Sequence, residues 1–339
     1  LCGAYLLLSA PGEMRRVTSA AVQSLMGREK ELSRRRAMPV RTLAVAPDLS
    51  PAELAAYLVP GKVHRFLIPG EKARILEERD LLRALPELAQ AHGAQIILLA
   101  GDLLDSGSPY PETAKALAET FAGCASEVFL APGNHDYYSA GAPYARLTFP
   151  ENVHIFRSPR IEAVTLPELG VRVWGAAFTD SRCPGLLRGF SVPKEPGVLD
   201  VLCMHGEVGN PASAYDPVSA AELAASGLDY AAFGHVHRFG GVQRAGGTVY
   251  AWPGCMEGRG FDETGEKGVL LVDVAAGDVQ ARFLPVPGRR YELLRVDVTD
   301  TDPVQAALAA LPEGAARNIY RIVLTGETDR APNPAALRA

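Results

Sequence analysis

The stretch Ala131-Pro132-Gly133-Asn134-His135-Asp136 decides the fold, because three other short stretches of the chain repeat its arrangement. Leu98-Leu99-Ala100-Gly101-Asp102 lies upstream, and Met204-His205-Gly206 and Phe233-Gly234-His235-Val236-His237 lie downstream. Each polar group directly follows an apolar run typical of a strand, at 96–99, 128–130, 201–204 and 230–233. Ligands and catalytic groups gather at the carboxyl ends of strands in an α/β sheet. The four stretches therefore predict a single site at that edge.

The side chains that these strand ends supply are Asp, Asn and His. Oxygen and imidazole ligands in this mixture suit a pair of divalent transition metals of the Mn, Fe or Zn kind. The sequence contains no His-Glu-x-x-His pair and no cysteine cluster, which argues against a zinc hydrolase with a single site. It contains no Gly-x-Ser-x-Gly turn either, which argues against a Ser-His-Asp triad.

The order Gly-Asp, Gly-Asn-His-Asp, His and Gly-His-x-His resembles that of the calcineurin-like metallophosphoesterases. A closer resemblance, to DNA-repair exonuclease subunits of the SbcD/Mre11 type, rests on Gly254–Gly268 and on Pro150–Phe156. The first of these segments reads Gly-Cys-Met-Glu-Gly-Arg-Gly-Phe-Asp-Glu-Thr-Gly-Glu-Lys-Gly. The similarity runs from about Pro69 to near the C-terminus. It implies an α/β (α+β) fold, a four-layer αββα sandwich with a small C-terminal α/β cap.

The resemblance also implies a metal site with two divalent ions, most simply Mn²⁺. Asp102 would bridge the two ions, and the second ion would be completed by Asn134, His205 and His235. The first ion would be held by His237 and by Asp48. His135 would act as the catalytic acid that protonates the leaving oxygen, and Asp136 would orient the His135 ring.

The first metal site departs from the family's pattern. The family has Asp-x-His after its first strand, whereas this chain has Asp48-Leu49-Ser50 after a strand predicted at 41–46. His64 is interpreted as a surface residue, because it is not two residues from Asp48. Losing groups around a metal lowers affinity by roughly 10–100-fold. We therefore expect the second site to bind metal more tightly than the first.

Three segments are expected along the chain. Residues 1–37 are interpreted as a poorly ordered or non-native extension, because their apolar start precedes a basic run, the reverse of a signal peptide. Residues 38–287 form the metallophosphoesterase (nuclease) domain. Residues 288–339 form a partial capping domain, since 291–298, 304–311 and 320–325 predict a β-α-β unit.

Composition places limits on location and partners. The 339 residues are 47% hydrophobic and 22% charged, as in ordinary globular proteins. The longest apolar run is far shorter than the roughly 20 residues of a membrane span. Five scattered cysteines are interpreted as reduced thiols of a cytoplasmic protein. Residues 1–37 carry seven Lys/Arg and three Glu, so that a net charge of −5 leaves −9 for the remainder, unlike a free-standing nucleic-acid binder.

Three functions stay open at this point. The first is a DNA exonuclease or endonuclease subunit in repair and recombination, with an SMC-like ATPase as partner, a possible homodimer and no membrane contact. The second is a small-nucleotide phosphodiesterase of the same fold. The third is a non-catalytic scaffold whose first metal site has degenerated. Candidate nucleic-acid contacts are basic residues and base-stacking tyrosines, namely Arg182, Lys194, Arg259, Tyr137, Tyr138 and Tyr144.

Overall fold

The computed structural model describes residues 40–44, 63–67, 69–104, 111–275, 278–286, 288–315 and 318–329. The chain divides into two compact units, Leu1–Asp80 and Leu81–Ala339. In the first unit, strands β1 (Val40–Ala44) and β2 (Val63–Leu67) pair in parallel. The strand predicted at 41–46 is thus confirmed over 41–44, whereas β2 was not predicted. Asp48 and Ser50, the predicted start of the first metal motif, lie outside the described residues.

A first sheet of three parallel strands opens the second unit. Its strands are β3 (Ile96–Leu99), β4 (Glu127–Leu130) and β5 (Val153–Ile155). Helix α4 (Pro69–His92) precedes β3, and helix α5 (Pro111–Thr120) connects β3 to β4. Ala114, Leu117, Ala118 and Phe121 follow the i, i+3, i+4, i+7 spacing of one helical face and are all buried. They explain why this Ala- and Leu-rich segment forms a helix against the sheet.

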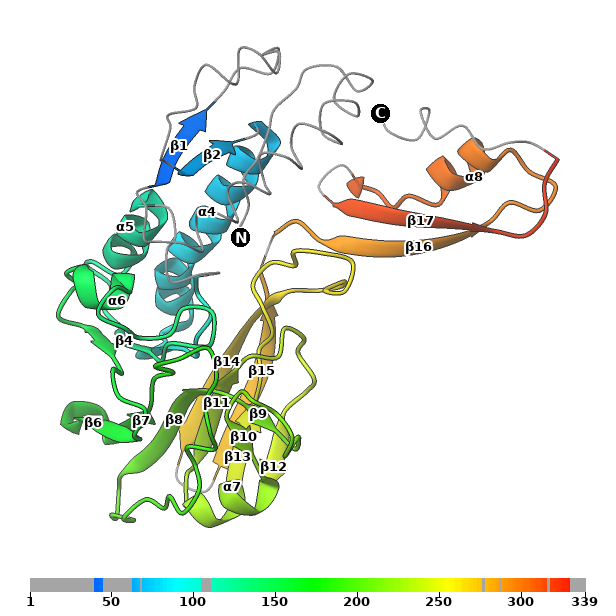
Figure 1. The fold of residues 1–339 in the computed structure, drawn as a ribbon. Coiled ribbons are helices and arrows are strands. Elements are labelled where there is room, and N and C mark those ends of the chain that lie inside the picture. The colour runs from blue at the N-terminus through cyan, green and yellow to red at the C-terminus, as the bar shows by residue number, and fades with distance from the viewer. Residues whose placement is uncertain are drawn as a thin grey trace. The chain divides into compact units, whose positions relative to one another are not determined.

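A second sheet of six strands has the order β12-β13-β11-β8-β7-β6. Its central strands are parallel, and β6 and β12 pair antiparallel at the two edges. Figure 1 shows these strands and helix α7 (Ala220–Ser226). The strands are β6 (Glu162–Leu166), β7 (Val171–Gly175), β8 (Leu199–His205), β11 (Tyr230–Gly234), β12 (Gln243–Ala245) and β13 (Thr248–Ala251).

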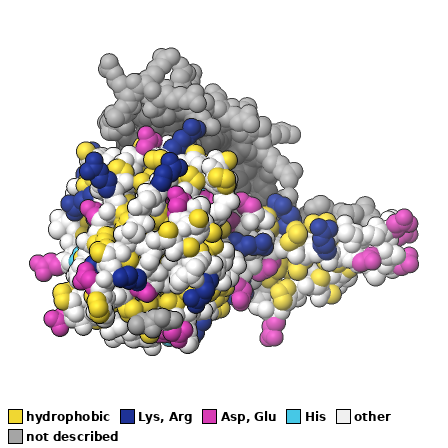
Figure 2. All heavy atoms as spheres, turned by 90° about the horizontal axis from the view of Figure 1, so that it is seen from below, with side chains coloured by type: hydrophobic (Ala, Val, Ile, Leu, Met, Phe, Trp, Pro, Cys, Tyr) yellow, Lys and Arg dark blue, Asp and Glu magenta, His cyan; other side chains and the backbone are white. Residues whose placement is uncertain are grey.

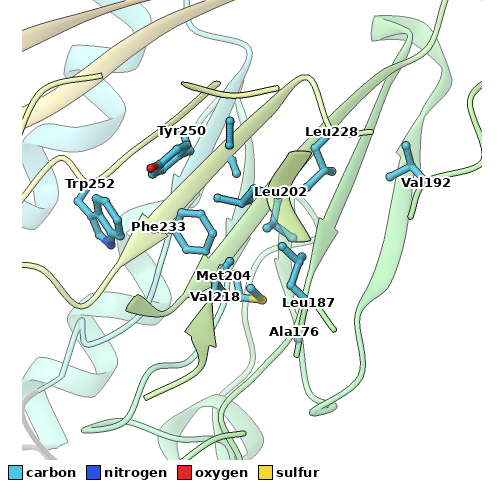
Figure 3. Packing of buried hydrophobic residues seen from close by; sticks show 13 residues of the cluster. Ala176, Leu187, Val192, Leu202, Met204, Val218, Leu228, Phe233, Tyr250 and Trp252 are labelled. Atoms are coloured by element: carbon cyan, nitrogen blue, oxygen red, sulfur yellow. The ribbon is translucent and has the colours of Figure 1, made fainter. Parts of the chain in front are cut away.

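Strand β8 shows how the layers are held together. Its side chains alternate between two cores, as the two-residue period of a strand requires. Leu202 and Met204 face a core with Leu223 of α7, and Figure 3 shows this packing beside Phe233. Val201 and Cys203 face the opposite core. A strand buried on both faces reads as a continuous apolar run, which is why β8 was predictable from sequence.

The core between the two sheets contains Phe129 and Ala131 from the first sheet and Val173, Val201 and Cys203 from the second. The outer face of the first sheet packs on α4 and α5, where Leu85 and Leu117 share a core with Val128 and Leu130. The layers thus run helix, sheet, sheet, helix. This arrangement confirms the predicted αββα sandwich of the α/β class.

The segment at 180–194 forms no helix or strand, yet part of it belongs to the core. Cys183, Leu187 and Val192 are buried, and the last two belong to the core around α7. The backbone amide of Val192 donates to the Ser226 carbonyl at 2.8 Å, which ties the segment to the end of that helix. An irregular segment therefore covers part of the sheet that helix α7 leaves open.

The C-terminal part of the chain contains two pairs of strands. β14 (Gly268–Ala275) and β15 (Asp278–Pro285) form an antiparallel hairpin. β16 (Tyr291–Asp297) and β17 (Ile319–Thr325) pair in parallel around helix α8 (Pro303–Ala309), which is the predicted β-α-β unit. The predicted domain boundaries at 37 and 287 stay predictions. Short elements are α6 (Pro143–Arg146), η2 (Pro167–Leu169), β9 (Glu207–Val208) and β10 (Pro217–Val218).

The helices within the described ranges were compared with the requirements of a membrane span. None of them combines the length and the apolar character that crossing a membrane requires.

Candidate metal centre

Three predicted ligands from two different sheets converge in the structure. Asp102 follows β3 of the first sheet, whereas His205 ends β8 and His235 follows β11 of the second. One ligand atom from each lies within 4.8 Å of the other two. The side-chain oxygen of Asn134, which follows β4, lies 2.9 Å from His205 Nε2. The structure therefore brings together the four residues predicted for the second metal site.

Glycines beside the ligands allow this convergence. A Cβ atom on Gly234 would lie 1.7 Å from the Ala100 carbonyl oxygen, and one on Gly133 would lie 2.4 Å from Asp102 Oδ1. Only glycine lets the strand-end loops of the two sheets approach so closely. Asp102 and His235 themselves have positive φ angles of 54° and 94°. Such strained backbone conformations concentrate at functional sites, and here they turn two ligands toward each other.

The buried carboxylate of Asp136 organises the loop that carries Asp102. It accepts hydrogen bonds from the backbone amides of Asp102 (3.1 Å), Leu104 (3.2 Å) and Gly133 (2.8 Å), and from the Tyr144 hydroxyl. This differs from the prediction that Asp136 orients the His135 ring, because its oxygens are directed to the backbone instead. Burial raises the pKa of Asp136, although the hydrogen bond from Tyr144 opposes that rise.

Tyr144 also differs from its predicted role in base stacking. Its side chain is buried, and burial together with the charge of Asp136 raises the pKa of its hydroxyl well above the ordinary value. A buried ring that supports Asp136 cannot stack on a nucleotide. Tyr137 and Tyr138 are half-buried, and their stacking role stays a prediction.

Hydrogen bonding fixes the tautomer of the neutral His205 ring. Its Nδ1 lies 2.9 Å from the Ala100 carbonyl, which can only accept, so Nδ1 carries the proton. In the neutral ring Nε2 then presents a lone pair. That lone pair faces Asn134 Oδ1 at 2.9 Å and Asp102 Oδ2 at 3.3 Å. Three acceptor atoms thus converge, an arrangement that a bound cation satisfies.

The protonation states of the other ligands also suit a metal, which requires carboxylates and neutral imidazoles. Burial opposes ionisation of Asp102, but hydrogen bonding to its carboxylate, including that of the His135 backbone amide, outweighs it and lowers the pKa of Asp102. Burial lowers the pKa of His235, which favours its neutral form. The donor set therefore fits a divalent transition metal.

The two remaining predicted histidines lie outside this cluster of ligand atoms. His135 is exposed, and its backbone amide donates to Asp102 Oδ1 at 2.9 Å. The His237 side chain is 54% exposed, and its Nδ1 is hydrogen-bonded to the carboxylate of Glu263. That hydrogen bond raises the pKa of His237 and lowers the pKa of Glu263 to about 2.

Three residues near the histidines were missed by sequence reasoning. Glu207 Oε2 lies 3.9 Å from His235 Nε2, and the Tyr215 ring lies 4.9 Å from the His235 ring. Glu207 comes two residues after His205, a spacing that puts side chains on one face of a strand, so a signal existed. Tyr215 and Glu263 offered no such signal, because irregular segments deliver them.

The predicted phosphate contacts have different surroundings. Lys194 Nζ lies 3.1 Å from Asp229 and 3.7 Å from Asp200, so its charge is paired with two carboxylates of the protein itself. Arg182 is exposed, and the backbone amide of Arg259 donates to Glu263 at 2.8 Å. The expectation for Lys194 is therefore weakened, and those for Arg182 and Arg259 stay predictions.

Comparison with known proteins shows which proteins this sequence resembles. Residues 76–239 match the family of calcineurin-like phosphoesterases. An uncharacterized metallophosphoesterase of Bacillus subtilis (strain 168), YhaO, is 30% identical over 236 residues, which cover 66% of this chain and 56% of that protein. The chain thus spans little more than half the length of this relative. Residues 76–239, just under half of the chain, are thus similar to the calcineurin-like phosphoesterases.

Similarity to solved structures was found as well. The crystal structure of TT1561 of Thermus thermophilus aligns with a TM-score of 0.38 and 15% sequence identity, covering 60% of this chain and 92% of that one. The closer resemblance to exonuclease subunits of the SbcD/Mre11 type stays a prediction.

Proposed function

We propose that this chain hydrolyses phosphodiester bonds with two divalent metal ions, most simply Mn²⁺. We also propose that its substrate is DNA. The observation that carries the hydrolytic part is the convergence of Asp102 Oδ2, Asn134 Oδ1 and the His205 Nε2 lone pair beside His235. The DNA part rests on the resemblance of Gly254–Gly268 and Pro150–Phe156 to the exonuclease subunits. In that role the chain serves repair and recombination in the cytoplasm, with an SMC-like ATPase and as a homodimer.

The residues of the chain divide the work between holding metal and moving a proton. Asp102, Asn134, His205 and His235 would hold one ion, and Asp102 with His237 and Asp48 would hold the other. When bound, such ions lower the pKa of water and stabilise charge on phosphoryl oxygens. Asp136 holds together the loop that carries Asp102 and its own loop, which carries His135.

His135 would give its proton to the leaving oxygen as the phosphorus–oxygen bond breaks. Its side chain is exposed, so a substrate can reach the ring. Its position is set by the backbone amide, which donates to the same carboxylate that the metal would use. This hydrogen bond therefore fixes the position of the proton donor, His135, relative to the proposed metal ligand, Asp102.

A small nucleotide is the second candidate substrate, and the charge distribution favours it. On the face shown in Figure 2, basic and acidic side chains of the described residues are interspersed and form no continuous basic surface. Duplex DNA usually binds through a row of Lys and Arg at its phosphates. A DNA substrate would therefore require basic groups on another face or on the ATPase partner. The non-catalytic scaffold stays the third candidate, because Ser50 stands in the place of a ligand.

Hydrolysis of three substrates tests the proposal. A DNA duplex, a cyclic nucleotide and a chromogenic phosphodiester are incubated with the protein and added Mn²⁺, beside Asp102→Asn protein purified in parallel. Cleavage of the duplex by the parent protein, and not by Asp102→Asn, supports the nuclease. Turnover confined to the cyclic nucleotide supports the small-nucleotide enzyme, and no turnover of any substrate contradicts the hydrolytic function.

A further inference from the structure

We propose that Glu263 is a positioning residue, which holds the His237 ring so that its Nε2 faces the first metal. This inference rests on the proposed two-metal function and adds a residue to it. Glu263 lies in the segment Gly254–Gly268, for which the sequence alone suggests no chemical role. The carboxylate oxygen Oε1 is hydrogen-bonded to His237 Nδ1, and the Glu263 side chain is only 13% exposed.

Glu263 is itself held in place by its own segment. Its second oxygen, Oε2, accepts a hydrogen bond from the Arg259 backbone amide at 2.8 Å. The Cys255 thiol lies 3.8 Å from the same oxygen. The contacts to Oε2 fix the orientation of the carboxylate, and Oε1 is then directed toward the His237 imidazole. A side chain fixed in this way can determine the orientation of the more exposed His237 ring.

The same segment also holds the backbone of His237. The buried ammonium of Lys267 donates to the His237 carbonyl at 3.2 Å, and the Cys255 amide donates to that carbonyl at 3.4 Å. Gly254 has a φ of 83°, and a Cβ atom there would lie 3.0 Å from the His237 carbonyl oxygen. The segment therefore contacts the main chain and the ring of one residue, His237, at several points.

The chemistry of a metal-binding histidine explains the arrangement. The Glu263 carboxylate can only accept, so His237 donates its Nδ1 proton, and the neutral form of the ring then has its lone pair at Nε2. A carboxylate on the far nitrogen of a ligating histidine fixes the tautomer and increases the basicity of the ligand. This support would matter most at the first site, where Ser50 replaces a predicted histidine.

The test compares Glu263→Gln with Glu266→Gln. Glu266 lies in the same segment, is 58% exposed and pairs with Arg290 at 3.3 Å, so it controls for the loss of one acid from the segment. Mn²⁺ binding to the whole chain is measured by calorimetry, and the His237 ring nitrogens are observed by NMR in metal-free protein. We expect Glu263→Gln to weaken the lower-affinity site by roughly 10–100-fold and to leave the tighter site unchanged. The Nδ1-protonated tautomer of His237 is expected to lose its preference, and Glu266→Gln to change neither readout.

A His237→Ala background separates positioning from a general structural role. Glu263→Gln should have no further effect on Mn²⁺ affinity once His237 is absent, because coupled residues are not additive. An equal loss in both backgrounds would overturn the inference and make Glu263 a ligand or a purely structural residue. Unchanged affinity and tautomer in Glu263→Gln would overturn it as well. If His237→Ala alone binds Mn²⁺ like the parent, the two-metal site of the proposed function fails instead.

Discussion

Strand β8 carries one buried polar residue near each end, and their surroundings differ. Near its start, Asp200 Oδ1 accepts hydrogen bonds from Arg172 Nε and Trp174 Nε1, both at 2.8 Å, whereas Oδ2 has an ion pair with Lys194 Nζ at 3.7 Å and no hydrogen bond. At its end, His205 Nε2 faces two oxygens, Asn134 Oδ1 and Asp102 Oδ2. The Asp200 and His205 side chains are both fully buried.

The difference separates a structural network from a binding site. Charges around Asp200 neutralise one another, and the hydrogen bond from Arg172 to Asp200 raises the pKa of that arginine. Two cations, Arg172 and Lys194, therefore balance the charge of this carboxylate without a ligand. Around His205 the three acceptor atoms face one another rather than a donor, and burial makes such an arrangement costly. We infer that the first cluster serves stability and that the second serves a cation.

The largest expected effect follows from Asp102→Asn, which tests the acceptor cluster directly. The amide has no charge for two metal ions to share, so metal-dependent hydrolysis should fall at least about 10³-fold, since such ions supply several kcal/mol of transition-state stabilisation. Turnover is measured at saturating Mn²⁺ together with metal content. Near-normal turnover under these conditions would show that the two-metal assignment is wrong.

The next effect concerns His135→Ala, which removes a proton donor beside the cluster without removing a ligand. The rate should fall by roughly 10²–10⁴, the range for a lost acid or base. Metal content should stay unchanged, because the His135 contact to Asp102 is made by its backbone amide. Elemental analysis beside the kinetics checks both statements. Loss of metal would instead identify His135 as a ligand.

A buried acid that belongs to neither cluster gives a pH-dependent prediction. Burial raises the pKa of Asp216 to about 7, although its Oδ1 accepts from the Leu186 amide. The folded state then keeps a proton that the unfolded state loses above pH 3.8, so stability falls as pH rises from about 4 to 7. The pKa difference corresponds to about 4 kcal/mol at most.

Asp216→Asn should remove that fall. We expect the free energy of unfolding of the variant relative to the parent to increase between pH 4 and 7 and to stay constant above pH 8. Urea titrations at fixed pH values measure it. A constant difference between parent and variant over the whole range would contradict the raised pKa of Asp216.

The smallest expected effect belongs to Asp200→Asn, the counterpart of Asp102→Asn at the other end of β8. We expect Asp200→Asn to cost about 3 kcal/mol of stability, because it removes one partner of a buried ion pair. The cost should not be larger, because Arg172 keeps its 2.7 Å contact with Glu195. Mn²⁺ affinity of the folded variant should equal that of the parent. A lost metal site in Asp200→Asn would mean that the two ends of the strand are not independent.

The sequence predicted the central strands and the residues that converge at the candidate site because both are local in sequence. An apolar run followed directly by Asp102 or His205 gives the strand, its end and the ligand together. Edge strands β6 and β12 were missed because their side chains are mostly exposed and leave no apolar run. The burial of Leu187 and Val192 was missed because irregular backbone has no period.

Side-chain direction was the other part that sequence could not supply. Asp136 follows His135, yet its carboxylate is directed to backbone amides and to Tyr144 rather than to the neighbouring ring. Glu263 reaches His237 across a separation of 26 residues through a loop whose path depends on Lys267 and Gly254. Contacts of this kind depend on tertiary packing, which no spacing along the chain encodes.

The central claim is that the acceptors around His205 form a metal site. Diffraction from crystals grown with Mn²⁺, recorded at wavelengths on both sides of the manganese absorption edge, tests it most directly. We predict an anomalous peak about 2.0–2.3 Å from Asp102, Asn134, His205 and His235, the ligand distances typical of divalent ions. No peak among these four residues, with Mn²⁺ found at other places or at none, would contradict the account.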